Sequence, residues 1–190
     1  MVTPGVKNYY MACLDLTGRR CLVVGGGSVG LEKANGLVTC GALVTVVSPE
    51  LHEDFAPLHV NWIKRRYRKR DLRGAFLVVA ATADRAVNER VSRDAEARGM
   101  LCNVADVPDL CNFILPAVHR EGPIAIAVST GGASPALAKR LRSQIAALVR
   151  PDHAVLAEQL RALRPEVKER FATYEERRDH FEELVTERLS

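Results

Sequence analysis

The chain has 190 residues, of which 47% are hydrophobic and 26% are charged, and its net charge is +4. This composition predicts a folded protein with one core domain and an appendage, and it excludes a disordered or fibrous chain. The sequence shows neither an apolar stretch of the ~18 residues that span a membrane nor an apolar secretory signal near its start, so we expect a cytoplasmic protein with no membrane partner.

The first predicted element is a strand that runs into a glycine-rich turn. Apolar residues 21–24 precede Gly25, Gly27 and Gly30, and a helical pattern over residues 31–40 follows. A G-x-G-x-x-G series between a strand and a helix is typical of dinucleotide-binding turns, although glycines alone can simply reverse a chain. Gly25 permits the tight turn, Gly27 lets the backbone approach a pyrophosphate, and Gly30 lets the helix pack closely on the strand.

The start of this helix is the expected phosphate site. Backbone N–H groups near Ser28 and Val29 have no acceptor within the helix, and the helix dipole favours an anion there. These two residues therefore join the glycines as candidate cofactor-binding residues.

A second strand, over residues 43–47, completes a βαβ unit and leaves it through Ser48, Pro49 and Glu50. Dinucleotide-binding proteins hold the cofactor ribose at this point, and either Ser48 or Glu50 can accept a hydrogen bond from a ribose hydroxyl. Because no arginine is adjacent to bind a 2′-phosphate, we expect NAD rather than NADP.

The rest of the first 130 residues alternates strands with helices. We expect a short strand within residues 58–67, a buried strand over 76–82, a helix over 84–98, and further strands over 100–104 and 124–130. This alternation predicts an α/β fold with a Rossmann-like, doubly wound parallel sheet. From Ser134 onward the pattern is helical, with breaks at Pro151 and Pro165.

Asp106 follows the strand over residues 100–104. Ligands of open α/β sheets bind at the carboxyl ends of the strands, where a carboxylate can accept a proton from a substrate. A turn-forming role before Pro108 accounts for the same residue equally well.

Ser129, Thr130 and Gly131 lie between a predicted strand and a predicted helix. Backbone N–H groups in such a turn can hold a substrate carboxylate, and a plain capped turn fits as well. His119 is either a proton relay or iron contact, or a solvated loop residue. The five cysteines have no C-x-x-C spacing, so we expect neither a disulfide framework nor a metal site.

Residues 64–70, from Lys64 to Arg70, form a dense basic run with one aromatic residue. Such a run usually lies on a solvated surface. It could instead bind nucleic acid or attract an anionic ligand. Attraction of an anion agrees with a charge of +7 over residues 1–150 against −3 over residues 151–190.

Five segments occur in an order that resembles a known family. They are residues Val24–Val29, Ala80–Asp84, Cys102–Asp106, Phe113–Ala117 and Ser129–Ala136. Together they are similar to precorrin-2 dehydrogenase, the N-terminal module of siroheme synthase. The resemblance implies NAD-dependent oxidation of precorrin-2 to sirohydrochlorin in siroheme biosynthesis, and it leaves open a second, chelatase activity that inserts ferrous iron.

The resemblance also implies roles for single residues. Asp106 becomes the catalytic residue, Thr82 joins the cofactor-binding set, and Asn103 joins Ser129, Thr130 and Gly131 as substrate-binding. It further implies a homodimer. We therefore expect an NAD-binding domain over residues 1–115, a dimerisation segment over 116–150 and a helical C-terminal region over 151–190.

Two further functions fit parts of the sequence. An NAD-sensing regulatory module needs only the first glycine turn, and the motifs that contain Asp106 and Ser129 favour an enzyme instead. A nucleic-acid-binding protein would use the basic run, but no recognition fold supports it.

Overall fold

The computed structural model describes residues 8–189 and divides into two compact units, one ending at Leu115 and the other beginning at Pro116. The strands of the first unit are β1 (Arg20–Val24), β2 (Leu43–Val47), β3 (Asn61–Ile63), β4 (Leu77–Ala80) and β5 (Leu101–Val104). Its helices are α1 (Ser28–Thr39) and α2 (Arg85–Glu96), with short 3₁₀ turns η1 (Glu53–Phe55), η2 (Lys69–Leu72) and η3 (Pro108–Leu110).

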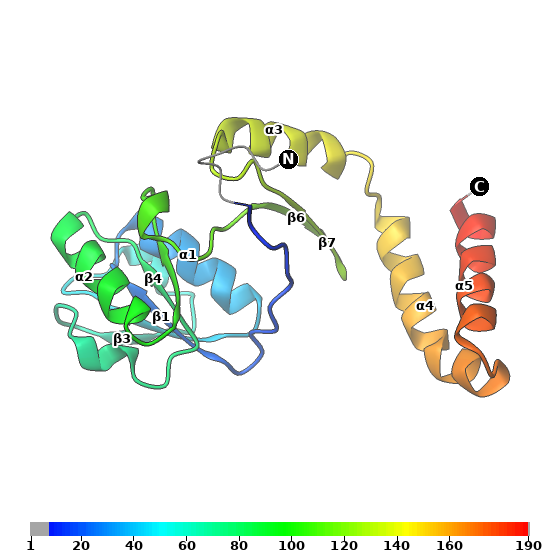
Figure 1. Cartoon of the computed structure of the whole chain (residues 1–190), viewed down its shortest axis with the longest axis horizontal. Helices are drawn as coiled ribbons and strands as arrows, with labels where there is room; N and C mark the ends of the chain where they lie inside the picture. Colours follow the sequence, from blue (N-terminus) through cyan, green and yellow to red (C-terminus); the bar gives the residue numbers. More distant parts are fainter. Residues whose placement is uncertain (1–7, 190) are drawn as a thin grey trace. The chain divides into compact units, whose positions relative to one another are not determined.

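All five strands of the first unit form one parallel sheet, in the order β3-β2-β1-β4-β5. Figure 1 labels β1, β3 and β4 of this sheet, with α1 and α2 on either side of them. Val24 of β1 lies beside Val47 of β2 on one side and beside Ala80 of β4 on the other, and Ala80 lies beside Val104 of β5. The strand order reverses at β1, where β2 and β4 flank it, which is the topological switch point of such sheets. This arrangement confirms the Rossmann-like, doubly wound fold.

Helices cover both faces of this sheet because successive side chains of a strand point to opposite faces. Val23 packs on one face in a cluster with Ala34 of α1, and Leu22 packs on the other with Val91 of α2. Burial on both faces explains why the predicted strand over residues 76–82 is a continuous apolar run.

The outer edge of β5 is covered by the chain that follows it. Asn112 Oδ1 accepts the Cys102 N–H at 2.7 Å, and the Asn112 N–H donates to the Cys102 carbonyl at 3.1 Å. The Asn112 side-chain amide also donates to the Met100 carbonyl at 2.8 Å. One returning residue, through its backbone N–H and its side chain, therefore replaces hydrogen bonds that a sixth strand would supply.

The second unit begins with a hairpin of β6 (Ala117–Glu121) and β7 (Ile124–Val128), which pair antiparallel in a sheet of their own. The strand that we expected over residues 124–130 in the parallel sheet is therefore wrong in its pairing, and β6 was missed. Gly122, in the left-handed region at φ 53°, and Pro123 form a two-residue turn between the strands. So short a connection allows only antiparallel pairing, because parallel strands need a crossover.

Three helices complete the second unit: α3 (Pro135–Ala146), α4 (Pro151–Arg170) and α5 (Tyr174–Leu189). The helix break that we expected at Pro165 is wrong, because α4 continues through this proline. The break comes at Thr173, whose hydroxyl accepts the Glu176 N–H at 3.2 Å while Glu176 accepts the Thr173 N–H at 2.9 Å. This reciprocal pair is a capping box, and it starts α5.

Candidate active site

The carboxyl ends of four strands bring most of the predicted site residues to one edge of the sheet. The register aligns the last residues of β1, β2, β4 and β5, so the residues that follow, Gly25, Ser48, Ala81 and Ala105, begin along a common line. Neighbouring strands lie about 4.8 Å apart, which puts the turn after β5 roughly 10 Å from the turn after β1.

At both ends of the glycine turn after β1, neighbouring backbone atoms leave no room for a side chain. Gly25 has φ 120°, and a Cβ there would overlap the Ala81 carbonyl oxygen of the neighbouring turn. A Cβ on Gly30 would overlap the carbonyl oxygen of Gly25. Both positions therefore need glycine for packing within the protein, as the motif predicts for the tight turn and for helix–strand contact.

Gly26 is a third constrained glycine, which the motif does not include. Its Cβ would overlap the Glu50 carbonyl oxygen and would lie 2.9 Å from Ser48 Oγ. The Gly26 carbonyl accepts the His52 N–H at 2.7 Å. This glycine therefore lets the turn after β2 pack directly on the turn after β1, and only the run of three consecutive glycines hints at it in the sequence.

Gly27 differs from these three glycines because a Cβ there would meet no atom within 4 Å. It is the N-cap of α1, with φ −80° and ψ −173°, a conformation open to any residue. The space beside it is therefore free for a ligand, as expected of the glycine that faces a pyrophosphate.

The N-terminus of α1 has no side-chain cap and no acidic residue in its first turn. In contrast, Asp84 caps α2 by accepting two N–H groups, and Ser134 caps α3. The first N–H groups of α1, near Ser28 and Val29, therefore stay available to an outside acceptor. Together with the open space at Gly27, this terminus fits a dinucleotide pyrophosphate.

The turn after β2 places its three candidate residues differently. Ser48 is buried, and its backbone is fixed because its N–H donates to the Ile63 carbonyl and its carbonyl accepts the Trp62 indole N–H at 3.0 Å. Pro49 and Glu50 are exposed. Glu50 is therefore the candidate with a carboxylate free to meet a ribose, and ribose binding at this turn stays a prediction.

Thr82 belongs to a closed hydrogen-bond network after β4. Its hydroxyl lies 2.8 Å from Asn88 Oδ1, its N–H donates to the same oxygen, and the Asn88 amide donates to the Thr82 carbonyl at 2.9 Å. Asn88 is buried on α2. The pair fixes the loop beside Gly25, so Thr82 shapes the candidate cofactor site whether or not it contacts the cofactor.

Asp106 is exposed and lies in the turn after β5 with φ 59°, the one left-handed non-glycine residue among residues 8–189. The Val107 N–H donates to the Val104 carbonyl at 3.3 Å and closes the turn. Positive φ at the third position is typical of a type II turn, which usually has glycine there. An aspartate in this left-handed conformation favours a role for its carboxylate, since glycine would form the turn more easily.

Asn103 is buried on β5, and its side-chain amide donates to the Phe113 carbonyl at 3.1 Å. The amide thus helps to hold the returning chain against the sheet edge. The contact of Asn103 with a substrate stays a prediction, whereas its role in holding the returning chain is seen in the structure.

The turn with Ser129, Thr130 and Gly131 belongs to the second unit and makes its own hydrogen bonds. The Gly131 N–H donates to Ser129 Oγ, the Ser134 N–H donates to Thr130 Oγ1 at 3.0 Å, and the Ala133 N–H donates to the Thr130 carbonyl. Of the three candidate residues, Gly131 has its N–H committed within the turn, and binding of a substrate carboxylate by Ser129, Thr130 and Gly131 stays a prediction.

His119 lies in β6 opposite Ile126, so the loop position that we considered is wrong. Its Nε2 is buried with no hydrogen-bond partner among the described residues. Over residues 8–189, no three His, Cys, Asp or Glu side chains gather as metal ligands.

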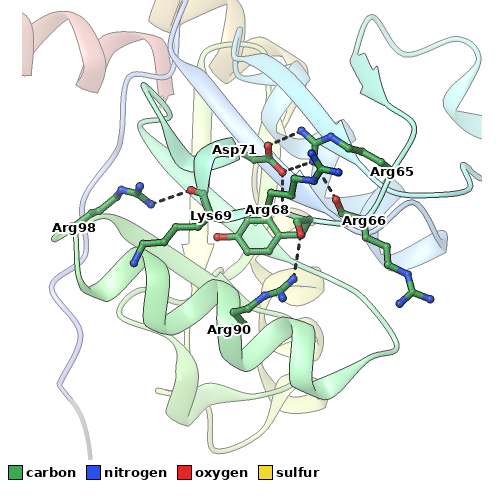
Figure 2. A network of polar contacts seen from close by, with 8 residues as sticks. Arg65, Arg66, Arg68, Lys69, Asp71, Arg90 and Arg98 are labelled. Carbon is green, nitrogen blue, oxygen red and sulfur yellow. Dashed lines mark hydrogen bonds and ion pairs between the residues drawn. The ribbon is translucent and has the colours of Figure 1, made fainter.

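The basic run is fixed to the first unit by ion pairs (Figure 2). Arg65 forms a two-pronged pair with Asp71, with N–O distances of 2.7 and 2.8 Å, and the Arg68 N–H donates to the same carboxylate. Burial of Asp71 raises its pKa, but the hydrogen bonds from Arg65 and Arg68 outweigh burial and hold the pKa below its usual value.

Residues of α2 and of the turn after it bind the same run from the other side (Figure 2). Arg90 donates to the Tyr67 carbonyl, Asp94 accepts from the Tyr67 hydroxyl and pairs with Lys69, and Arg98 donates to the Lys69 carbonyl. Burial, and then the negative Asp94, raise the pKa of Tyr67. Because Tyr67 is only 4% exposed, its ring is not a platform on which a nucleic-acid base can stack.

Comparison with known proteins agrees with this geometry. Residues 12–117 match a family described as putative NAD(P)-binding, and residues 121–148 match the central segment of a sirohaem biosynthesis protein. No helix in the described part of the chain is both long and apolar enough to span a bilayer.

The siroheme synthase of Methylobacillus flagellatus is 42% identical over 175 residues, and that of Nitrosomonas eutropha is 39% identical over 183 residues. These alignments cover 90% and 94% of this chain but only 38% of each relative, so the chain spans about two fifths of the curated relatives that it matches. The structure of SirC, a precorrin-2 dehydrogenase, is similar with a TM-score of 0.79 and 29% identity, over 96% of this chain and 93% of that one.

The first family match covers more than half of the chain and contains the glycine turn, the sheet and Asp106. The chain therefore belongs to the putative NAD(P)-binding family.

Proposed function

We propose that this protein is an NAD-dependent precorrin-2 dehydrogenase that forms sirohydrochlorin in siroheme biosynthesis. The observation that carries the proposal is an open, uncapped helix N-terminus at the switch point of the sheet, with a strained aspartate on the same sheet edge. Similarity to SirC along nearly the whole of both chains supports the substrate.

In this proposal the turn between β1 and α1 binds the cofactor. The N–H groups at the start of α1 hold the pyrophosphate, Gly27 leaves room for it, and the turn from Ser48 to Glu50 holds the ribose. Bound NAD supplies a hydride acceptor. The absence of an acidic side chain from the first turn of α1 avoids repulsion of the phosphates.

Asp106 accepts the proton that leaves precorrin-2 when a hydride departs to the nicotinamide. Oxidation removes two hydrogen atoms from the macrocycle, one as a hydride and one as a proton, so a base is needed as well as the cofactor. An exposed carboxylate in the turn after β5 can take this proton and release it to water.

The decisive experiment is an anaerobic assay with purified protein, precorrin-2 and NAD. Formation of sirohydrochlorin together with NADH, followed by absorbance, is expected, and NADP should support a lower rate. A protein that binds NAD without turnover would contradict the dehydrogenase and would support the NAD-sensing module.

Ferrous iron insertion is a second proposed activity, with the ion as substrate. The same assay with added ferrous iron should give the siroheme spectrum. Sirohydrochlorin that stays metal-free under these conditions would limit the protein to oxidation.

We also propose that the protein is a homodimer in the cytoplasm. The described part of the second unit buries only three hydrophobic residues, Ala138, Ala154 and Val167. Three leucines at helical spacing in α3 and just after it form an apolar stripe: Leu137, Leu141 and Leu148 are 50%, 38% and 71% exposed. An apolar stripe on a unit with so small a core is typical of an interface between copies of a chain.

A further inference from the structure

A buried thiol contacts the turn that carries Asp106. Cys111 Sγ accepts the Val104 N–H at 3.1 Å and lies 3.2 Å from the Val104 carbonyl and 3.3 Å from the Val107 carbonyl. The thiol has one proton, which it donates to either carbonyl. Because Val104 and Val107 are the first and last residues of the turn, the thiol holds both of its ends.

The turn needs such support because little else closes it. Its own backbone hydrogen bond is long, at 3.3 Å, and Asp106 sits in the left-handed region at φ 59°. A backbone conformation of this kind persists only where its surroundings enforce it. On its inner side the turn is tied to the sheet by the Ala105 N–H, which donates to the Ala80 carbonyl. On the outer side, at the sheet edge, the Val104 N–H donates to the thiol.

We propose that Cys111 is a positioning residue, which acts through Asp106 by fixing the turn that presents the carboxylate. The inference rests on the proposed function, in which Asp106 accepts the substrate proton. Cys111 is 8% exposed and lies at the edge of the core cluster, so its thiol reaches the turn from inside the protein.

A matched control distinguishes positioning from ordinary core packing. Cys102 lies on β5, is 2% exposed and belongs to the same core cluster, so its replacement by alanine removes the same buried atom. The Cys102 thiol forms its hydrogen bond with Ser92, whereas the hydrogen bonds from a thiol to Val104 and Val107 come from Cys111. Both alanine variants should lose stability, and only Cys111→Ala should loosen the turn.

Hydrogen exchange tests whether the Cys111 thiol holds the turn, and it needs no assay of activity. In Cys111→Ala we expect the Val104 and Val107 amides to exchange at least about tenfold faster relative to the rest of the sheet, because the Val104 N–H loses its acceptor. Cys111→Ser should keep most of the protection, since a hydroxyl donates and accepts in the same place. Unchanged exchange at these amides in Cys111→Ala, or equal loosening in Cys102→Ala, would overturn the proposal.

Kinetic measurements test whether Cys111 affects catalysis through the position of Asp106. Cys111→Ala should lower kcat about 10- to 100-fold with little change in the KM for NAD, because a misplaced carboxylate slows chemistry rather than cofactor binding. Cys102→Ala should keep its kcat, and Cys111→Ser should recover most of it. In an Asp106→Asn background, Cys111→Ala should cause no further loss, whereas an additive loss would show that the thiol does not act through Asp106.

The two tests also separate this inference from the proposed function. Wild-type protein without turnover would contradict the dehydrogenase, and exchange at Val104 and Val107 would then decide alone whether the thiol holds the turn. Turnover in the wild type with a normal kcat in Cys111→Ala would overturn the inference and leave the dehydrogenase in place.

Discussion

Asp106 combines an exposed carboxylate with a backbone conformation that glycine adopts more readily. We expect Asp106→Asn and Asp106→Gly to change the free energy of unfolding by less than about 1 kcal/mol, because both residues tolerate positive φ. Both should lower kcat by at least about 100-fold, since both remove the proton acceptor. Denaturant unfolding and the anaerobic assay measure the two effects.

Asp106→Ala is a less suitable variant because alanine at φ 59° adds about 1 kcal/mol of backbone strain to the loss of the carboxylate. Full activity of Asp106→Asn would reduce Asp106 to a turn-forming residue, which the sequence alone left as an equal alternative.

Single residues also mark where sequence reasoning stops. The motif predicts the packing roles of Gly25 and Gly30, because a dinucleotide-binding fold needs a tight turn at the first position and close packing of helix on strand at the last. It does not predict the role of Gly26, because the atoms that exclude a side chain there belong to Ser48 and Glu50, more than 20 residues further along the chain. The hydrogen bonds of Asn103 and Cys111 were missed for another reason: they depend on how the chain after β5 folds back on this strand, which no motif records.

At the scale of elements, the uncapped N-terminus of α1 makes the protein less stable than a capped one would, and a single substitution can measure the difference. Gly27→Asp places a good N-cap residue where the backbone accepts any side chain. We expect it to raise the free energy of unfolding by about 0.5 kcal/mol. The same carboxylate should occupy the pyrophosphate space and abolish NAD binding, which isothermal titration calorimetry measures.

Gly30→Ala should have the opposite effect on stability. Its Cβ would overlap the Gly25 carbonyl oxygen, so it should lower the free energy of unfolding. Tight NAD binding by Gly27→Asp would show that the cofactor lies elsewhere.

The ion pair between Arg65 and Asp71 makes the attachment of the basic run depend on pH. The pKa of Asp71 in the folded protein lies below its usual 3.8, so its contribution to stability is complete at neutral pH and is lost as the pH falls below about 4. Asp71→Asn should cost about 1–3 kcal/mol at pH 7, and the difference from the wild type should shrink in acid.

Unfolding in urea between pH 3 and pH 7 measures this dependence. Asp152→Asn is the matched control, because Asp152 pairs with Arg150 on the open surface, where we expect no measurable effect. An Asp71→Asn variant with a constant deficit across this range would contradict the assigned pKa.

At the scale of the whole molecule, the exposed stripe on α3 predicts the state of assembly. A double variant, Leu137→Asp with Leu141→Asp, should be monomeric at concentrations where the wild type is a dimer, because it places two charges in the proposed interface. Light scattering after gel filtration measures the mass. Lys139→Glu changes an exposed residue of the same helix but leaves the stripe intact, so it should stay dimeric.

The order of strands and helices in the first unit could be predicted because each βαβ step is local and each buried strand is uniformly apolar. The second unit was harder to predict. The second strand of its hairpin, β7, shows the same apolar pattern as a buried strand, and Gly122 and Pro123 indicate the reversal before it. The helix break was assigned to Pro165, which lies exposed within α4, instead of Thr173, where a capping box starts the next helix.

The covered outer edge of β5 prevents the sheet from accepting a further strand there. Asn112 and Cys111 already form hydrogen bonds with the outward-facing backbone groups of Cys102 and Val104. These groups are therefore not available to pair with a strand of another chain. The polypeptide that leaves this edge has to start an independent sheet, as β6 and β7 do. Loss of the Asn112 side chain should therefore do more than weaken the sheet: it should open a surface for aggregation by strand addition between molecules.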